Sequence, residues 1–156
     1  MTKMYLKKTI TTISFTLLAA MAAFAQTSAP ATLKDNDNKT AIEVYNIMKA
    51  QGGGSVGKGK SGKGKSNNTA PKVSISGYAV KVGPDVYGLP SVELSDTKGG
   101  KTRILCVLPF TDYLKLRHVS KGDKVTIKGE VRGYADEYDF VLVKQSKIVS
   151  VNGKKP

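Results

Sequence analysis

The chain contains one histidine and one cysteine, the side chains most often used as nucleophiles, bases and metal ligands. Together, Cys106 and His118 could in principle form a nucleophile–base pair. A zinc site normally needs more His, Cys or carboxylate ligands than these two provide. Cys106 also alternates with the apolar residues Ile104, Leu108 and Phe110, which is typical of a half-buried strand. We therefore expect a small buried core residue rather than a catalytic thiol, a ligand-binding thiol or an interchain disulfide.

A second group that could do chemistry is the acidic cluster Asp136, Glu137 and Asp139. Carboxylates of this kind can bind a hard cation such as calcium, but the spacing is not that of an EF-hand, and the alternative is a solvated loop. No glycine-rich phosphate-binding motif is present either. The sequence therefore predicts a protein that is not an enzyme and has no cofactor and no metal.

Residues suited to binding are more numerous. Tyr87 lies in the turn-rich segment GPDVYG, and Tyr134 and Tyr138 flank a second loop. Such tyrosines can stack on the bases of a single-stranded nucleic acid, or they can pack the end of a barrel. The alternation of the two neighbouring strands predicts that Ser91, Glu93 and Ser95, and then Arg103, Leu105 and Val107, face outward. The candidate ligand-binding residues are Tyr87, Arg103, Leu105, Val107, Arg132, Tyr134 and Tyr138.

Charge gives this predicted surface a mixed character. Lys81, Lys124 and Lys128 would add positive charge near it, whereas Glu93 and the acidic cluster of the second loop would repel phosphate. The two exposed apolar residues Leu105 and Val107 would need a cover, either from the N-terminal helix or from a protein partner.

Five predicted strands position these residues. They span 72–82, 89–96, 101–110, 123–132 and 138–149, and a short helical connector, 111–119, separates the third from the fourth. In the first strand the apolar parity changes at Gly77, which predicts a bulge or a sharp bend. In the fourth, a Lys-Gly-Asp turn precedes inward-facing Val125, Ile127 and Val131. This order predicts an all-β fold, the five-stranded Greek-key barrel called the OB-fold, with ligands on the face of its second and third strands.

Residues 72–149 resemble the small exported OB-fold domains of bacteria grouped as the tRNA-anti-like family. The resemblance rests on the strands VSISGYAV, ILCVLPF, SKGDKVTIKGEV and FVLVKQSKIV. It implies the same barrel, and its link to anticodon-binding domains is one of fold. The chain departs from the family in a Gly/Lys-rich linker between the N-terminal helix and the first strand.

The segments outside the barrel have distinct compositions. Residues 1–25 have a basic start, an apolar run and the sequence Ala-Phe-Ala, which predicts an export signal cleaved after Ala25, with a membrane anchor as the alternative. Residues 26–37 are expected to be disordered. Residues 38–50 are expected to form a short helix with a capping box from Thr40 to Glu43. Its apolar stripe, Ala41, Val44, Tyr45 and Met48, would dock either on the barrel or on a partner.

A Gly/Lys-rich linker covers 51–70, the barrel 71–150 and a basic tail 151–156. The linker is either a polycationic tether or a soluble spacer. The net charge is +13, but nine of the excess lysines lie outside the barrel. They are Lys3, Lys7, Lys8, Lys58, Lys60, Lys63, Lys65, Lys154 and Lys155.

These features together favour a periplasmic or secreted protein without a membrane-spanning segment in its mature form. We expect a monomeric, non-enzymatic module that binds an envelope protein or an anionic polymer. Two alternatives stay open: a single-stranded nucleic-acid or oligonucleotide-binding protein, and a structural or stress-related envelope factor.

Overall fold

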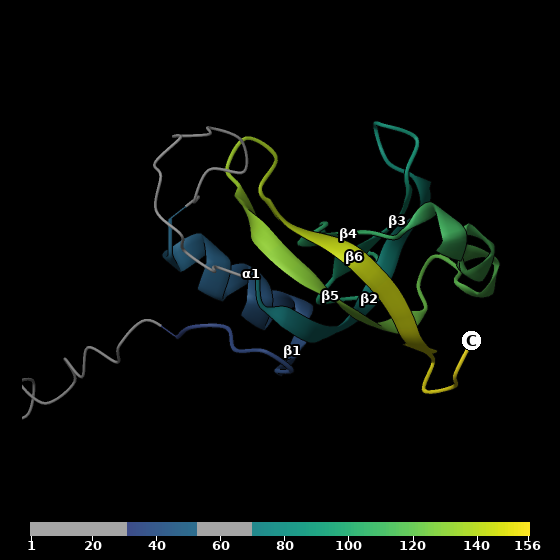
Figure 1. The fold of residues 1–156 in the computed structure, drawn as a ribbon, viewed down its shortest axis with the longest axis horizontal. Helices are drawn as coiled ribbons and strands as arrows, with labels where there is room; N and C mark the ends of the chain where they lie inside the picture. The colour runs from purple at the N-terminus through teal and green to yellow at the C-terminus, as the bar shows by residue number, and fades with distance from the viewer. Residues whose placement is uncertain (1–30, 53–69) are drawn as a thin grey trace, which may run out of the picture.

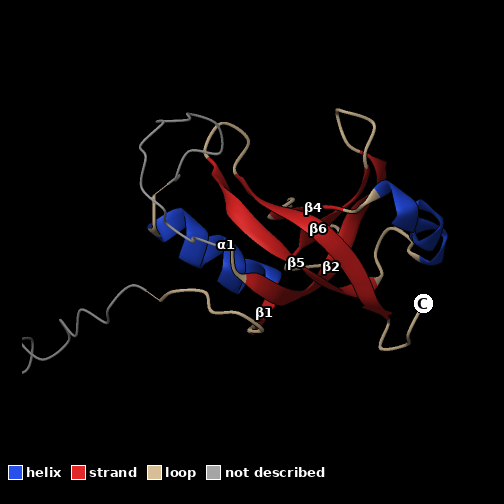
Figure 2. Ribbon diagram, viewed as in Figure 1, coloured by secondary structure: helices blue, strands red, loops and turns tan. Residues whose placement is uncertain are grey.

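The computed structural model describes residues 31–52 and 70–156, and Figures 1 and 2 show how its elements are arranged. The elements are β1 (Asn38–Thr40), α1 (Ala41–Ala50), β2 (Lys72–Pro84), β3 (Pro90–Ser95), β4 (Ile104–Val107), the 3-10 helix η1 (Phe110–His118), β5 (Lys124–Ala135) and β6 (Phe140–Val151). The predicted export signal and most of the predicted linker lie outside the described residues. Within the described ranges, no helix combines the length and apolar character needed to cross a bilayer.

The strands form a closed barrel with an extra strand. Their order is β1-β2-β3-β4-β6-β5, and β2 also pairs with β5, which closes the barrel. β4 and β6 run parallel, and the pairs β2–β3, β3–β4 and β5–β6 are antiparallel. Strands β2 to β6 are therefore the five strands of an OB-fold, as the sequence predicts, and β1 is an addition to it.

β2 serves both sides of the barrel. Its first half pairs with β5 and its second half with β3, with a register shift between Ala79 and Lys81. The predicted position of this bulge, Gly77, is therefore wrong by a few residues. Gly77 has a different role, since a Cβ there would lie 2.8 Å from the Ser95 carbonyl oxygen and 3.1 Å from the Ala41 Cβ. The glycine lets α1 approach the barrel closely.

β5 follows the predicted Lys-Gly-Asp turn. Gly122 has a φ of 91°, and Ser120 donates its backbone N–H to the Asp123 carboxylate at 2.7 Å. Val125, Ile127 and Val131 are buried as predicted. Gly129 marks a bulge, where the register with β6 shifts between Lys128 and Glu130.

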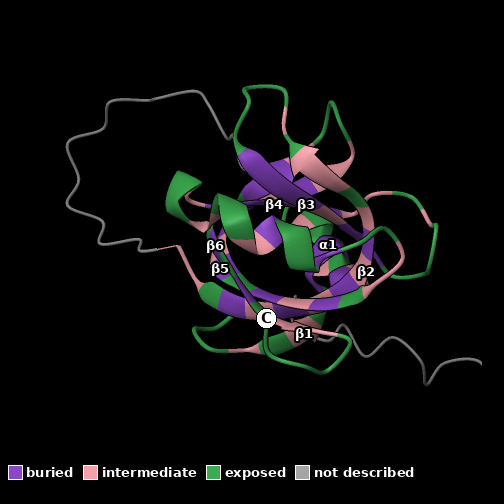
Figure 3. Cartoon of the chain, turned by 90° about the vertical axis from the view of Figure 1, so that its right-hand side faces the viewer, coloured by how far each residue is buried: buried purple, intermediate pink, exposed green. Residues whose placement is uncertain are grey.

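α1 docks on its own barrel. It begins at Ala41, later than predicted, and Thr40 and Glu43 form the predicted capping box. Ala41, Val44 and Tyr45 are buried in the core, and Met48 packs against it. The helix covers one end of the barrel, while η1 lies at the other end and contributes buried Leu116 (Figures 1 and 3). Of the two alternatives that the sequence left open, docking of the helix on the barrel is confirmed, rather than docking on a partner.

The ordered region begins before the helix. The backbone N–H of Asn36 donates to Lys72 O at 2.7 Å, and that of Ser74 donates to Asp37 O at 2.8 Å. These contacts lead into β1, which pairs in parallel with Ser74–Ser76 of β2. The end of the segment predicted to be disordered is therefore hydrogen-bonded to the barrel. At the other terminus β6 reaches Val151, inside the predicted tail.

Candidate binding surfaces

The outer face of β3 and β4 is less open than the sequence predicts. Ser91 and Ser95 are buried, and the Ser91 hydroxyl donates to the Gly83 carbonyl oxygen at 2.9 Å. Val107 is buried as well, at 8% exposure, so its predicted role as an exposed contact is wrong. Leu105 is half-buried and stands in register with Leu142 of β6. This face therefore offers one partly exposed leucine on β4 rather than two exposed apolar residues.

A pair of stacked aromatic side chains lies at the edge of this face. Phe140 and Leu142 alternate with buried Val141 and Val143, so they point out of the barrel. The Tyr138 ring stacks on Phe140 with centroids 5.8 Å apart and an interplanar angle of 23°. Tyr138 is exposed, as the sequence predicts. Phe140 was not among the candidates because the sequence alone does not place β6 beside β4.

Next to the second predicted loop, Tyr134 belongs to a partly buried polar cluster around Asp139. Tyr134 is buried and donates its hydroxyl to the Asp139 carboxylate at 2.6 Å, and the Tyr45 hydroxyl donates to the same oxygen. The two rings meet edge to face, with centroids 5.8 Å apart. Tyr134 therefore packs α1 against the barrel, and its candidacy as a ligand-stacking residue is wrong. Its pKa rises to about 12, chiefly because it donates to Asp139.

Basic side chains complete the cluster around Asp139. Lys101 donates to one carboxylate oxygen at 2.5 Å and Lys49 to the other at 3.0 Å. The Arg103 guanidinium lies over the Tyr45 ring at 4.6 Å and is 3.7 Å from the carboxylate. These donors, with Lys101 first, hold the pKa of Asp139 far below its usual range. Three basic side chains therefore share the single carboxylate of Asp139, and Arg103 helps to dock α1 on the barrel rather than being a free cation.

The remaining candidates lie apart from one another. Tyr87 is 86% exposed in the β2–β3 loop, at the opposite end of the barrel from Tyr138. Arg132 is exposed on β5 but forms an ion pair with Glu130 at 2.6 Å. The structure therefore does not bring the seven candidate residues together into one site.

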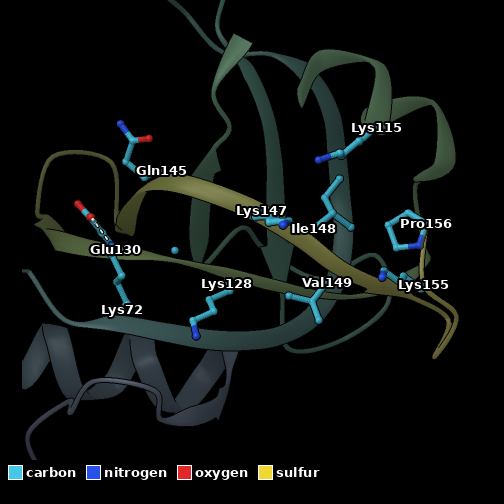
Figure 4. A pocket seen from close by; sticks show the side chains of 11 residues that line it. Lys72, Lys115, Lys128, Glu130, Gln145, Lys147, Ile148, Val149, Lys155 and Pro156 are labelled. Atoms are coloured by element: carbon cyan, nitrogen blue, oxygen red, sulfur yellow. Dashed lines mark ion pairs between the residues drawn. The ribbon is translucent and has the colours of Figure 1, made fainter. Parts of the chain in front are cut away.

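A lysine-lined groove over β5 and β6 is a feature that the sequence did not predict. Its volume is about 610 Å³, and Figure 4 shows the side chains that surround it. They are Lys72, Lys115, Lys128, Gly129, Glu130, Gln145, Lys147, Ile148, Val149, Lys155 and Pro156. The groove is thus lined by five lysines from different parts of the chain and by a single carboxylate, that of Glu130. We call this feature the lysine groove.

The bulge in β6 shapes the floor of the lysine groove. Gln145 has a φ of 50°, a conformation that costs energy for a residue other than glycine. Ser146 turns inward, fully buried, and donates its hydroxyl to the Val143 carbonyl oxygen at 3.3 Å. A Cβ on Gly129 would lie 2.6 Å from a methyl carbon of buried Val143, so the glycine lets β5 and β6 approach closely beneath the groove.

The lysines of this groove are only partly neutralised. Lys72 lies 3.5 Å from the Glu130 carboxylate, and Lys115 lies 2.7 Å from that of Asp112. Lys128 and Lys147 are cross-strand partners, and neither has a carboxylate within 4 Å among the described residues. Like charges directly opposite each other in a sheet are destabilising. The sheet therefore keeps a repulsive pair in the middle of the lysine groove.

The residues considered for chemistry do not form a reactive site in the part of the chain that the structure describes. Cys106 is fully buried, and its burial raises the pKa of the thiol to about 12. His118 lies exposed at the end of η1. No group of three or more His, Cys, Asp or Glu residues within 31–52 and 70–156 is arranged to hold a metal ion. The prediction that Cys106 is a core residue is confirmed.

The chain has relatives among known protein families and solved structures. No curated protein matches the chain. Among solved structures it is similar to a lipoprotein of Klebsiella pneumoniae whose description suggests nucleic-acid binding, at 16% identity and a TM-score of 0.41. That match covers 52% of this chain and 71% of the other. A family model described as tRNA_anti-like matches residues 1–147. This match extends over most of the sequence, and the chain therefore belongs to the tRNA_anti-like family.

Proposed function

We propose that this OB-fold protein is a non-enzymatic binding module for an anionic polymer, and that the lysine groove is its binding site. The observation that carries the proposal is the cross-strand pair Lys128 and Lys147, which faces the groove without a carboxylate within 4 Å in the described residues. A fold keeps an unfavourable charge pair at a cost in stability. A ligand with repeated anionic groups would remove that repulsion on binding.

The acidic residues of the barrel support this assignment. Glu93 pairs with Lys81 at 3.3 Å, and Asp139 is occupied by three basic side chains. Glu130 divides its two oxygens between Lys72 and Arg132. The barrel has a small overall excess of positive charge, and the lysine groove brings five lysines together with the single carboxylate of Glu130. A polymer such as polyphosphate or a sulfated polysaccharide matches this pattern, because it presents anions at regular spacing.

The direct test is binding of fluorescent polyphosphate to the chain that begins at Gln26, followed by anisotropy at fixed salt. Replacing both Lys128 and Lys147 by alanine should weaken binding about fifteenfold at ~0.15 M salt, because each phosphate contact contributes roughly fourfold through counterion release. The matched control replaces Lys98 and Lys121, which are exposed and do not line the lysine groove. Equal losses in the two variants would contradict the proposal.

A third variant separates the groove from the linker. Deleting residues 52–66 removes four lysines without touching the barrel. Binding that disappears in this variant and survives in the groove variant would assign the polymer to the linker instead.

The exposed stack of Tyr138 on Phe140 supports a second candidate, a single-stranded nucleic acid whose bases extend the stack. Base–aromatic stacking contributes about 1–3 kcal/mol per base. Tyr138→Ala should then weaken binding of an oligonucleotide at least about fivefold, whereas Tyr87→Ala at the other end of the barrel should not. If the wild-type protein, Tyr138→Ala and Tyr87→Ala bind the oligonucleotide with equal affinity, nucleic-acid binding through the Tyr138–Phe140 stack is excluded.

We also propose that the protein is exported, on the basis of the sequence of residues 1–25. Mass spectrometry of the protein recovered from the native envelope should show a chain that starts at Gln26. An unprocessed chain would contradict the predicted cleavage.

A further inference from the structure

The end of the barrel opposite α1 carries a concentration of exposed apolar side chains. Of the eight large apolar residues that are exposed in the described parts of the chain, six belong to the β2–β3 loop and to η1. They are Val86, Tyr87, Leu89, Phe110, Tyr113 and Leu114. We call these six residues the apolar tip. Soluble proteins rarely expose such side chains together unless the surface meets another apolar phase.

Both segments of the apolar tip lie at one end of the fold. The loop ends where β3 begins, and β4 ends opposite that point, because Ser91 is in register with Val107. η1 follows β4 directly, and the Leu108 N–H donates to the Pro90 carbonyl oxygen at 2.8 Å. Figure 1 shows the loop and η1 on the same side of the molecule.

The apolar tip is held in place by local contacts. The Asp85 carboxylate accepts the backbone N–H groups of Tyr87 and Leu89 at 2.8 and 2.9 Å, so the loop has a defined turn. The Phe110 and Tyr113 rings stack with centroids 6.1 Å apart. Val86, next to Tyr87 in the loop, is 89% exposed. The two segments therefore project side chains outward instead of folding them onto the core.

Positive charge borders the apolar tip. Lys115 and Arg117 lie in the last turn of η1, and Lys115 pairs with Asp112 of the same helix at 2.7 Å. Lys115 also lines the lysine groove, so the cationic surface continues from the groove to η1. Aromatic and aliphatic side chains next to lysine and arginine are the combination that favours the interface of an anionic bilayer. A projecting tip whose Val86 and Tyr87 are almost fully exposed suits a deformable lipid phase, which needs no matching pocket.

We propose that the apolar tip docks on the surface of a membrane that contains anionic lipids. Tyr87 and Phe110 enter the headgroup region from the two segments, and the cations of η1 contact lipid phosphates. This inference goes beyond the polymer site, because the apolar tip and the Lys128–Lys147 pair share no residue; Lys115 is the groove residue that would also face the membrane.

The sequence allows a clean test, because the chain contains no tryptophan. Leu114→Trp in the chain that begins at Gln26 places a single fluorophore in the apolar tip. Vesicles of phosphatidylcholine with a minor fraction of phosphatidylglycerol should shift its emission to the blue, and the protein should sediment with them. Vesicles of phosphatidylcholine alone should bind more weakly.

Matched serine variants decide where binding occurs. In the Leu114→Trp background, Tyr87→Ser with Phe110→Ser should reduce vesicle partitioning about tenfold or more for each side chain removed. The control, Tyr138→Ser with Val149→Ser, replaces the two other exposed apolar residues and should leave partitioning unchanged. Circular dichroism checks that both variants fold.

Three outcomes would overturn the proposal. They are no binding to either kind of vesicle, equal loss in the two serine variants, and a dimer in gel filtration that the Tyr87→Ser, Phe110→Ser variant abolishes. The last result would assign the apolar tip to a second copy of the chain. Polyphosphate affinity that the Tyr87→Ser, Phe110→Ser variant leaves unchanged would show that membrane docking and polymer binding are separate properties.

Discussion

Reversing the charge of Lys147 should stabilise the protein and weaken its binding to anionic polymers at the same time. Lys147 lies opposite Lys128 across β5 and β6 and has no carboxylate partner among the described residues. In Lys147→Glu the repulsive pair becomes an attractive one. Lys128 keeps its hydrogen bond to the Asn36 side-chain oxygen at 2.9 Å, so no existing contact is lost.

The size of the effect follows from the geometry of the pair. A cross-strand charge pair contributes about 0.2–1 kcal/mol, and here a repulsion is removed as well. We therefore expect the free energy of unfolding to rise by about 0.5–1 kcal/mol, which corresponds to a rise in Tm of roughly 2–6 °C for a domain of this size. The gain should shrink in high salt, because both side chains are exposed to solvent.

The binding effect has the opposite sign. Loss of one phosphate contact should lower the salt slope of polymer binding by about 0.7 for a single-stranded polyanion. The carboxylate also adds repulsion inside the lysine groove, so the affinity should fall by more than in Lys147→Ala. A protein that becomes more stable and binds less is not expected from general damage to the fold.

Urea unfolding and a double-mutant cycle test the reasoning. Lys128→Glu combined with Lys147→Glu restores a like-charge pair and should cancel most of the gain. Lys98→Glu is the matched control on an exposed turn and should change stability by less than about 0.5 kcal/mol. A coupling energy of zero between positions 128 and 147 would refute the cross-strand repulsion. A stabilised Lys147→Glu protein with unchanged polymer affinity would refute the lysine groove as the binding site.

Three further predictions concern the packing of the barrel. The pKa of Asp139 is depressed by folding, so its stabilisation is present above its unfolded pKa of about 3.9 and is lost as the pH falls below it. Thermal melts should therefore show that Asp139→Asn lies well below wild type at neutral pH and approaches it in acid, and a gap that is independent of pH would contradict this. Val44→Ala removes two buried methyl groups and should cost about 2–3 kcal/mol in urea unfolding, while exposed Asn46→Ala on the same helix should cost less than about 0.5. Gly129→Ala should cost about 1–3 kcal/mol because its Cβ would meet a Val143 methyl carbon at 2.6 Å, and a neutral substitution would show that β6 can move away.

The fold could be predicted because its strands carry a regular apolar alternation. Ile104 and Cys106 on one strand and Val125 and Ile127 on another all point inward, as their spacing requires. The capping box at Thr40 is equally local, since it needs only residues three apart in the sequence. Such signals depend little on the rest of the chain.

The binding surfaces could not be predicted in the same way. Tyr134 and Tyr138 are equivalent in a sequence, both in a loop beside acidic residues, yet one is buried against α1 and the other is exposed. The difference depends on Asp139, whose contact with Tyr45 joins positions 94 residues apart. The alternation of apolar residues also predicted wrongly that Val107 is exposed, because the pattern along one strand does not reveal what covers its outer face.

The lysine groove depends on register rather than on composition. Lys128 and Lys147 become neighbours only through the pairing of β5 and β6, and the bulge at Gln145 decides which residues stand opposite each other. A count of charges along the barrel therefore shows near balance, whereas the folded surface separates the charges.

The contact between Tyr45 and Asp139 also sets the order in which the molecule can assemble. α1 has ten residues and would be marginal in isolation. The side chains that fix it arrive near the end of the chain, with β5 and the β5–β6 loop. Contacts between segments so distant in sequence form late, because loop closure must come first. α1 therefore cannot complete its contacts until β5 and the β5–β6 loop have been synthesised, although its contact with Gly77 of β2 can form earlier.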